Sequence, residues 1–539
     1  MLKREYMVKG FKQIAVITMA SRVFGLVRDM AYSYFLGASN LMDAWAIAFK
    51  IPNLARRLFG EGAASASFIP VYSEELQSDK DSAAKLANTV VTAVFIILAA
   101  LVIFGWIVMW GYNAIAGGRG ETTLIISLSS IMLPYALMVC LVAILAGILN
   151  VHKHFAAPAA APIVLNICII SMLVIAGRYF DATPRQQVFA VAFGVLIAGI
   201  IQIAMQLLPL RAKGIKIRCE WDTHSEAFKK IMILMAPMII GLTVTQLNTL
   251  ADDLIAWFFS GSQEKGQVFN FFAHQIKYPL WRGSVSHLYY SQRMYQLPLG
   301  VFGISLATAI FPVMSAQAAR KDYPGLCASI ARGIKGAVFI AVPATVGLLL
   351  VTKPLVAAFF ESEGGKFDAA DTYMTSRTLM FYAIGLCGFF LQQILTRAFF
   401  SMKDSKTPMY SAIIAVIVNI ALNLTLIWPL GTAGLALSTA ICSYLQVLIL
   451  IVILTRRFGK AFFDGFGPVL IKTFIAAAVM GLIGFCVVYL MRNLPSGAGA
   501  TRYDILRLIA AVPTCAGVYY IMAKILRNEM LALFGPSKQ

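Results

Sequence analysis

About fourteen apolar stretches, most of them 20 to 30 residues long, follow one another along this chain of 539 residues. A helix rises 1.5 Å per residue, so about 20 residues cross the ~30 Å hydrocarbon core of a bilayer. Hydrophobic residues make up 59% of the chain and charged residues 13%, against about 45–50% and 25% in soluble domains. The pattern excludes a soluble globular enzyme and predicts an all-α polytopic membrane protein with about 14 transmembrane helices.

Gly, Pro and charged residues separate the apolar stretches and set their approximate limits. The predicted spans are 11–36, 42–72, 84–111, 122–149, 158–178, 187–209, 227–259, 284–317, 326–351, 372–400, 407–428, 432–455, 468–491 and 503–526.

The basic residues predict the orientation of these helices. Lys and Arg number 45 against 25 Asp and Glu, a net charge of +20. Basic loops of membrane proteins face the cytoplasm, and here they alternate along the chain with loops that are poor in Lys and Arg. We therefore expect both termini to be cytoplasmic, and we expect the positive charge to face anionic lipid rather than nucleic acid.

A weak internal repeat divides the chain. The motif Tyr34-Phe35-Leu36-Gly37 returns 224 residues later as Phe258-Phe259-Ser260-Gly261, and a second motif, at 69–73, returns 242 residues later at 311–315. The difference of 18 places an insertion at about 263–282, for which the sequence suggests no role. Transporters are often built from such repeats. We predict two six-helix lobes, 1–210 and 211–458, followed by two extra helices in 459–539.

The first two predicted helices carry many charges at bilayer depth, where each costs about 3 kcal/mol on insertion scales. These residues must face a water-filled cavity, pair with one another or bind a ligand. The charged residues are Arg22, Arg28, Asp29, Asp43, Lys50, Arg56, Arg57 and Glu61, with Asn53 among them and Arg293 in the eighth span.

Arginines outnumber acids in this set, so the predicted cavity is electropositive. The planar guanidinium group matches phosphate oxygens with two parallel hydrogen bonds. The expected cargo is therefore an anion, with phosphate or diphosphate the best match. The alternative for part of the set, Lys50 and Arg57 above all, is interfacial ion pairing or side chains that reach toward the membrane surface.

A second polar cluster is predicted in the second half of the chain. Asp252 lies in the seventh span, Asn419 and Asn423 lie four residues apart in the eleventh, and Thr439 lies in the twelfth. One carboxylate with amide and hydroxyl oxygens can bind Na⁺ or a proton. The alternative is a hydrogen-bonded cluster between helices.

No enzyme signature accompanies these sites. The sequence contains no P-loop, no G-x-S-x-G motif and no loop with clustered carboxylates. The eight cysteines are scattered, without a C-x-x-C pair, and are interpreted as packing residues. We expect neither catalysis nor an organic cofactor.

Two stretches resemble a known family. The segments Ser21-Arg22-Val23-Phe24-Gly25-Leu26-Val27-Arg28-Asp29 and Phe49-Lys50-Ile51-Pro52-Asn53-Leu54-Ala55-Arg56-Arg57 are similar to the opening motifs of the MurJ (MviN) lipid II flippases. The likeness continues at 406–408 and 434–438 and covers nearly the whole chain.

The resemblance implies the fold of the MOP superfamily, in which two six-helix lobes form a V and two C-terminal helices help to form a groove for a lipid tail. It implies movement of lipid II, the undecaprenyl-diphosphate-linked peptidoglycan precursor, across the bacterial inner membrane by alternating access. Arg22, Arg28, Arg56 and Arg293 match the family's cavity arginines, and Asp43 matches its acid at the start of the second helix. Energy would come from the membrane potential or a Na⁺ or H⁺ gradient, and the cell-wall synthesis machinery is an expected partner.

Two positions depart from the family pattern. Gln292 and Gln296 stand where many members carry acids around the arginine of the eighth helix. The alternatives are a flippase for another polyprenyl-linked glycan, a cation-coupled exporter of the same superfamily, a membrane enzyme acting on polyprenyl phosphates, or a scaffold protein without transport.

Overall fold

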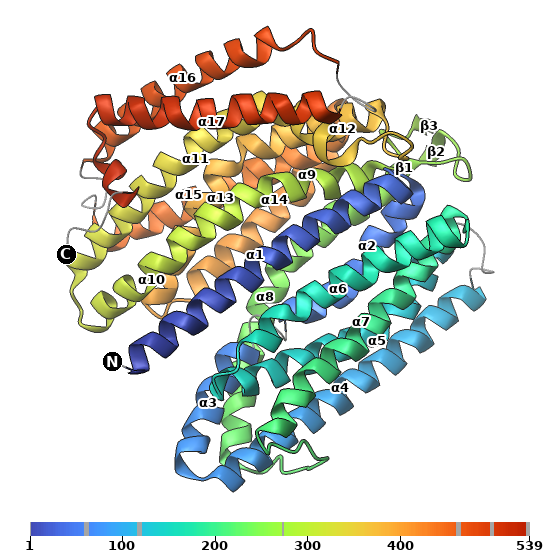
Figure 1. Cartoon of the computed structure of the whole chain (residues 1–539), viewed down its shortest axis with the longest axis vertical. Helices are drawn as coiled ribbons and strands as arrows, with labels where there is room; N and C mark the ends of the chain where they lie inside the picture. Colours follow the sequence, from blue (N-terminus) through green and yellow to red (C-terminus); the bar gives the residue numbers. More distant parts are fainter. Residues whose placement is uncertain are drawn as a thin grey trace. The chain divides into compact units, whose positions relative to one another are not determined.

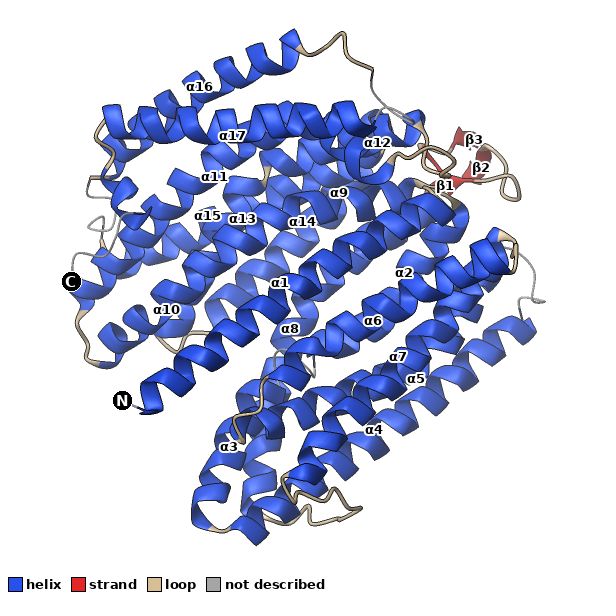
Figure 2. Cartoon of the chain, in the orientation of Figure 1, coloured by secondary structure: helices blue, strands red, loops and turns tan. Residues whose placement is uncertain are grey.

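The computed structural model is almost entirely helical. It describes residues 2–58, 64–115, 121–271, 274–459, 465–495 and 501–534. In the described residues, strands occur only in a short region between α8 and α9 (Figures 1 and 2). The α-helices are α1 Leu2–Leu36, α2 Asn40–Ala55, α3 Ala64–Ser78, α4 Lys80–Ile115, α5 Glu121–Val151, α6 Ala156–Val174, α7 Pro184–Ala212, α8 Glu226–Phe258, α9 Ser284–Pro298, α10 Ile304–Ala319, α11 Tyr323–Phe360, α12 Ala369–Ile384, α13 Leu386–Ser401, α14 Lys406–Leu430, α15 Thr432–Phe458, α16 Phe466–Leu490 and α17 Thr501–Ile525.

Ten helices of the described chain are long and apolar enough to cross a membrane, and an eleventh span is added if α12 and α13 count as one bent helix. Every predicted span coincides with a helix or with an interrupted helix. The predictions of an all-α fold and of a multi-pass membrane protein are confirmed, whereas the number of fourteen spans stays a prediction.

Some predicted spans are not single α-helices in the described residues. The fifth passes from α6 into the π-helical segment η2, Ile175–Tyr179, and the eighth consists of α9 and α10 joined by the π-helical segment η3, Leu299–Gly303. The second is described as α2 and α3. The tenth bends by 45° between α12 and α13. At this bend a Cβ atom on Gly385 would lie 2.8 Å from the Cα of Ala440, so the close approach of α15 requires glycine.

The described chain divides into two compact units, Met1–Leu250 and Ala251–Gln539. In the first, α2 and α3 pack on α5, α4 packs on α3 and α5, α5 packs on α7, and α6 packs on α1 and α7. These contacts define one ordered bundle of six predicted spans, which Figure 1 shows in blue to green.

For its second to sixth spans, the second unit repeats this order of packing. Here α9 and α10 pack on α12 and α13, α11 packs on α10, α12 and α13, α12 and α13 pack on α15, and α14 packs on α15. In both units the second span therefore meets the fourth, the third meets the fourth, and the fifth and fourth meet the sixth. The predicted repeat is confirmed, and the boundaries 1–210, 211–458 and 459–539 stay a prediction.

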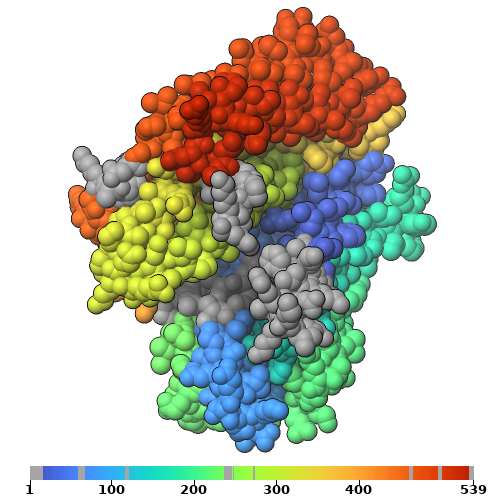
Figure 3. Space-filling view, turned by 60° about the vertical axis from the view of Figure 1, so that its left-hand side comes forward, coloured from blue at the N-terminus to red at the C-terminus, as the bar shows by residue number. Residues whose placement is uncertain are grey.

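The two C-terminal helices, α16 and α17, pack on each other and on α11, and they form part of the surface of the second unit (Figure 3). Arg507 donates to the Asp504 carboxylate at 2.7 Å and also to the backbone carbonyls of Met491 and Leu494. Asp504 is fully buried and Arg507 is 6% exposed. A buried guanidinium of α17 thus satisfies backbone carbonyls in the turn that follows α16.

The insertion predicted at 263–282 forms short strands. Strand β2, Val268–Phe271, pairs antiparallel with β3, His274–Lys277, and β1, Ser260–Gly261, pairs parallel with β4, Leu280–Trp281. An aromatic cluster joins this ribbon to the end of α14, since the Phe269 ring lies 6.4 Å from the Trp428 ring. The sequence did not predict these strands, because the hydrophobic pattern of the chain is dominated by helix.

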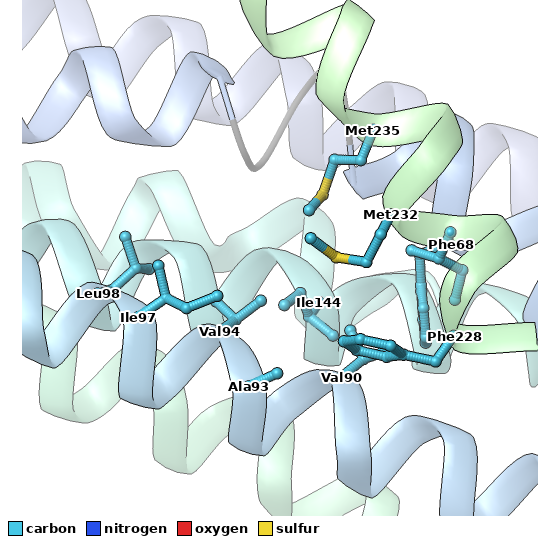
Figure 4. Close-up of a pocket in the computed structure, with 11 residues that line it drawn as sticks. Phe68, Val90, Ala93, Val94, Ile97, Leu98, Ile144, Phe228, Met232 and Met235 are labelled. Atoms are coloured by element: carbon cyan, nitrogen blue, oxygen red, sulfur yellow. The ribbon is translucent and has the colours of Figure 1, made fainter. Parts of the chain in front are cut away.

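The first turns of α8 belong to the first unit and pack on α4. Phe228 and Met232 point toward Val90 and Val94 of α4 around an apolar cavity of about 40 Å³ (Figure 4). The preceding segment is bound to the same helix, because the backbone N–H groups of residues 218, 220 and 222 donate to side chains of Asn88, Thr92 and Thr89. The segment before α8 and the first turns of α8 are thereby attached to α4.

A tyrosine–histidine contact holds the turn between α5 and α6. The Tyr72 hydroxyl lies 3.0 Å from Nε2 of His152, and Lys213 donates to the His152 carbonyl at 2.8 Å. Burial and the neighbouring Lys213 ammonium lower the pKa of His152 from its ordinary value of 6.5. The folded protein therefore favours the neutral imidazole, which can hydrogen-bond Tyr72.

This shift predicts a pH dependence of stability. The unfolded chain takes up a proton at His152 more readily than the folded protein, so the free energy of unfolding should fall as the pH drops below 6.5. Above that pH the contribution should be constant. We expect His152→Gln to weaken the pH dependence of the thermal unfolding midpoint in detergent, and His154→Gln to leave it unchanged. An identical pH profile for His152→Gln and the wild type would contradict the assignment.

Candidate functional site

The charged residues of α1 differ in their surroundings. Arg28 donates through Nε and Nη2 to Oδ1 of Asp29, at 3.1 and 2.8 Å, and through Nη1 to Oδ1 of Asn166 on α6 at 3.0 Å. Asp29 is only 3% exposed. Arg22 is exposed, and no hydrogen bond or ion pair involves it within the described chain. Arg28 is therefore held in place, whereas the guanidinium of Arg22 is open to a ligand.

Helix α2 positions a second group of the predicted residues. Ser39 caps the helix by accepting from the N–H of Met42, and Asp43 lies fully buried in the first turn. A carboxylate is favourable there because it faces the positive end of the helix dipole. At the other end of the helix, Arg56 donates through Nε to the side chain of Asn53 at 3.0 Å. Asn53 thus orients the Arg56 guanidinium.

Lys50 and Arg57 contact α8. The Lys50 ammonium donates to the backbone carbonyl of Thr249 at 2.8 Å, and Arg57 donates to the side chain of Gln246 at 2.8 Å. Lys50 lies in α2 and Arg57 lies two residues beyond its end. They link α2 to α8 within the first unit, and Glu61, the last acid of the predicted set, lies outside the described residues.

The second unit contributes Arg293 on α9. Its guanidinium carbon lies 4.6 Å from the centre of the Tyr289 ring, a cation–π distance. The neighbouring Gln292 donates to the Tyr382 hydroxyl at 3.1 Å. The amide of Gln292 thus makes a neutral hydrogen bond to α12.

The predicted cation-binding residues come together. Asn423 Nδ2 donates to Asp252 Oδ1 at 2.6 Å and to Asn419 Oδ1 at 2.9 Å, and the Thr439 hydroxyl donates to Asp252 Oδ2 at 3.2 Å. Asp252 is 1% exposed, and both asparagines are fully buried. The cluster brings together a carboxylate with amide and hydroxyl oxygens, a set of ligands suited to a small hard cation. The same contacts also agree with the alternative, a hydrogen-bonded cluster between helices.

The family model of the lipid II flippase MurJ matches residues 32–499. The chain belongs to the MurJ family. The match runs from the end of α1 through α16, and the family resemblance predicted from the sequence motifs is confirmed.

Individual MurJ relatives are similar over most of their length. The probable lipid II flippase MurJ of Vibrio cholerae is 32% identical over 452 residues, 81% of each chain. That of Rhizobium tropici is 30% identical over 533 residues, 96% of this chain and 94% of the relative. The chain is therefore comparable to these MurJ proteins along nearly its whole sequence.

Solved structures agree with the MurJ assignment. A lipid II flippase MurJ in an inward closed conformation matches with a TM-score of 0.73 at 26% identity, covering 95% of this chain and 99% of that one. An inward-facing MATE family transporter of the MOP superfamily matches with a TM-score of 0.64 at 15% identity, covering 83% and 98%. The second likeness concerns the fold alone, and it supports the predicted MOP architecture.

One residue of the site was missed by the sequence analysis. Asn166, 5% exposed on the apolar helix α6, accepts from Arg28 and donates to the backbone carbonyl of Ser21. An asparagine within such a helix is itself a signal, because an amide in hydrocarbon needs a partner. Nothing in the linear sequence indicates which helix supplies that partner.

Proposed function

We propose that this protein moves lipid II from the inner to the outer leaflet of the bacterial cytoplasmic membrane by alternating access. The observation that carries the proposal is the MurJ family match over residues 32–499. The protein acts in this proposal as a transporter and not as an enzyme. Both termini are cytoplasmic, and the cell-wall synthesis machinery is the partner that uses the exported precursor.

Arginines supply the attraction for the diphosphate of the headgroup. Arg22 is exposed on α1, Arg56 is oriented by Asn53, and Arg293 lies over Tyr289. Each guanidinium can donate two parallel hydrogen bonds to phosphate oxygens. Arg28 adds positive charge from its place beside Asp29, and the lipid tail remains in the bilayer near α16 and α17.

The membrane potential or a cation gradient supplies the energy, and Na⁺ is the coupling ion that the Asp252 cluster fits. Asp252, Asn419, Asn423 and Thr439 would hold the ion, with the carboxylate as the charged ligand. Moving one charge across the membrane is worth about 2.3 kcal/mol per 100 mV. Binding at this cluster would link the state of α8 to α14 and α15 within the second unit.

Cation binding predicts a specific stabilisation. In detergent, Na⁺ should raise the thermal unfolding midpoint of the wild type relative to choline at equal ionic strength, because a ligand that binds only the folded state stabilises it. Asp252→Asn should remove this difference. Glu264→Gln, which removes one exposed carboxylate from the same unit, should retain it. A full Na⁺ response in Asp252→Asn would refute the site.

Complementation tests the proposed function. A bacterial strain depleted of its own lipid II flippase should grow and keep its shape when it expresses this protein. Lysis despite normal amounts of the protein in the membrane would contradict the proposal. Rescue only in a strain that lacks a flippase for a different polyprenyl-linked glycan would reassign the cargo and leave the transport class intact.

A further inference from the structure

In the internal repeat, the charged pair of α1 is equivalent to the acidic pair of α8. The offset of 224 that relates the ends of these helices makes Arg28 the equivalent of Asp252, and Asp29 the equivalent of Asp253. All four positions lie in the described helices, and Asp29, Asp252 and Asp253 are each at most 3% exposed. At one equivalent position, the first unit therefore carries a positive arginine and the second unit a negative aspartate.

Each of the two positions contacts an asparagine of the fifth helix of its unit. In the first unit Arg28 donates to Asn166 of α6, and in the second Asn423 of α14 donates to Asp252. The helices α6 and α14 begin after matching turns, in which Lys153 and Lys403 have φ angles of 57° and 61°. Asn166 lies ten residues into α6 and Asn423 seventeen into α14, so the two asparagines share the fifth helix of their units but differ in height by about two helical turns.

The two clusters offer similar oxygen ligands, but a guanidinium group lies between those of the first unit. The Asp252 cluster presents carboxylate, amide and hydroxyl oxygens. In the first unit, a carboxylate and an amide oxygen also converge, from Asp29 and Asn166, and a guanidinium occupies the space between them. The side chains of the Arg28–Asp29 ion pair are only 12% and 5% exposed.

We propose that the first unit contains a monovalent-cation site that its own Arg28 fills. Asp29 and Asn166 form this site, and the tethered guanidinium takes the place that an exchangeable cation takes beside Asp252. The comparison with Asp252 rests on the proposed function, whereas the occupied site in the first unit rests on the contacts of Arg28 alone. The first unit would then keep a fixed charge, and only the second would respond to cations.

Removal of the guanidinium supplies the test. Arg28→Ala leaves the buried Asp29 carboxylate without this counter-charge and opens a space of the right size and polarity for a small planar cation. In detergent, the full-length variant should unfold several degrees below the wild type. Guanidinium chloride at low millimolar concentration, far below its denaturing range, should restore most of the loss, and equal NaCl should restore less.

Matched variants make the result specific. In Arg28→Ala combined with Asp29→Asn, guanidinium should have no effect, because the charged ligand of the site is gone. Arg22→Ala, which alters an exposed arginine of the same helix, should show neither the loss nor the rescue. Should Arg28→Ala fail to accumulate, Arg28→Ser, whose small polar side chain also leaves the space open, carries the same measurement.

Two outcomes would overturn the proposal. One is an unfolding midpoint for the Arg28 variant equal to that of the wild type, and the other is a loss that guanidinium does not reverse. Either would leave Arg28 as a ligand-facing or packing residue. Failure of the Na⁺ response of the wild type would instead remove the proposed coupling site at Asp252, and the guanidinium result would still decide the site in the first unit.

Discussion

Replacing Arg22 with alanine is expected to reduce transport of the lipid-linked precursor by about tenfold to a hundredfold, the loss that follows from removing a charge-assisted bidentate contact worth about 1.5–3 kcal/mol. Arg22 is exposed on α1, and it makes no hydrogen bond or ion pair in the described part of the chain. Its removal therefore breaks no internal contact. The thermal unfolding midpoint should match that of the wild type, so the loss would reflect the ligand alone.

The conservative replacement sharpens this prediction. Arg22→Lys keeps the positive charge but lacks the planar fork, so it should retain an intermediate rate. Arg185→Ala, an exposed arginine in the first turn of α7, serves as the control and should transport normally. Full transport by Arg22→Ala, at equal amounts of protein in the membrane, would show that this guanidinium does not meet the headgroup.

Arg507→Met is expected to lower the free energy of unfolding by about 3–5 kcal/mol, the usual effect of breaking a buried ion pair on one side. The substitution leaves Asp504 fully buried with its guanidinium partner removed, and it also removes the donors to the carbonyls of Met491 and Leu494. The effect should appear as a lower thermal unfolding midpoint. Arg502→Met, on the exposed side of the same helix, should change the midpoint little.

A second substitution separates the effect of the buried charge from that of the hydrogen bonds to the backbone carbonyls. Combining Arg507→Met with Asp504→Leu removes the buried charge as well, and it should recover a large part of the lost stability. The carbonyls of Met491 and Leu494 would still lack the guanidinium donor. A double variant as unstable as Arg507→Met would show that the hydrogen bonds to the turn after α16, and not the ion pair with Asp504, dominate the contribution of Arg507.

The hydrophobic pattern of the sequence and the spacing of its polar residues were sufficient to predict the helices and part of the site. Each predicted span coincides with a helix or an interrupted helix. The charged residues of the first two predicted helices were expected to need partners, and Lys50 and Arg57 both donate to groups of α8. Asp252, Asn419, Asn423 and Thr439 were predicted to meet and do so. These predictions succeeded because each polar group in a membrane helix must find a partner, and few partners were available.

Other features depend on packing that a linear pattern does not contain. At the bend between α12 and α13, α15 approaches Gly385 too closely for a side chain, and the π-helical segment η3 interrupts a stretch with continuous hydrophobicity. The hairpin at β2 and β3 is stabilised by an aromatic contact with Trp428, which is distant in sequence. Arg28 was predicted as a substrate ligand from its charge, whereas its contact with Asn166 required the three-dimensional fold.

The leaflet position of the precursor tests the central claim most directly. In cells depleted of their own flippase and expressing this protein, labelled lipid-linked precursor should become accessible to an enzyme or probe added outside the cytoplasmic membrane, at a level close to that of cells with their native flippase. Arg22→Ala should leave the label inside. Precursor that stays on the inner leaflet, although the wild-type protein is present in normal amounts, would contradict the account.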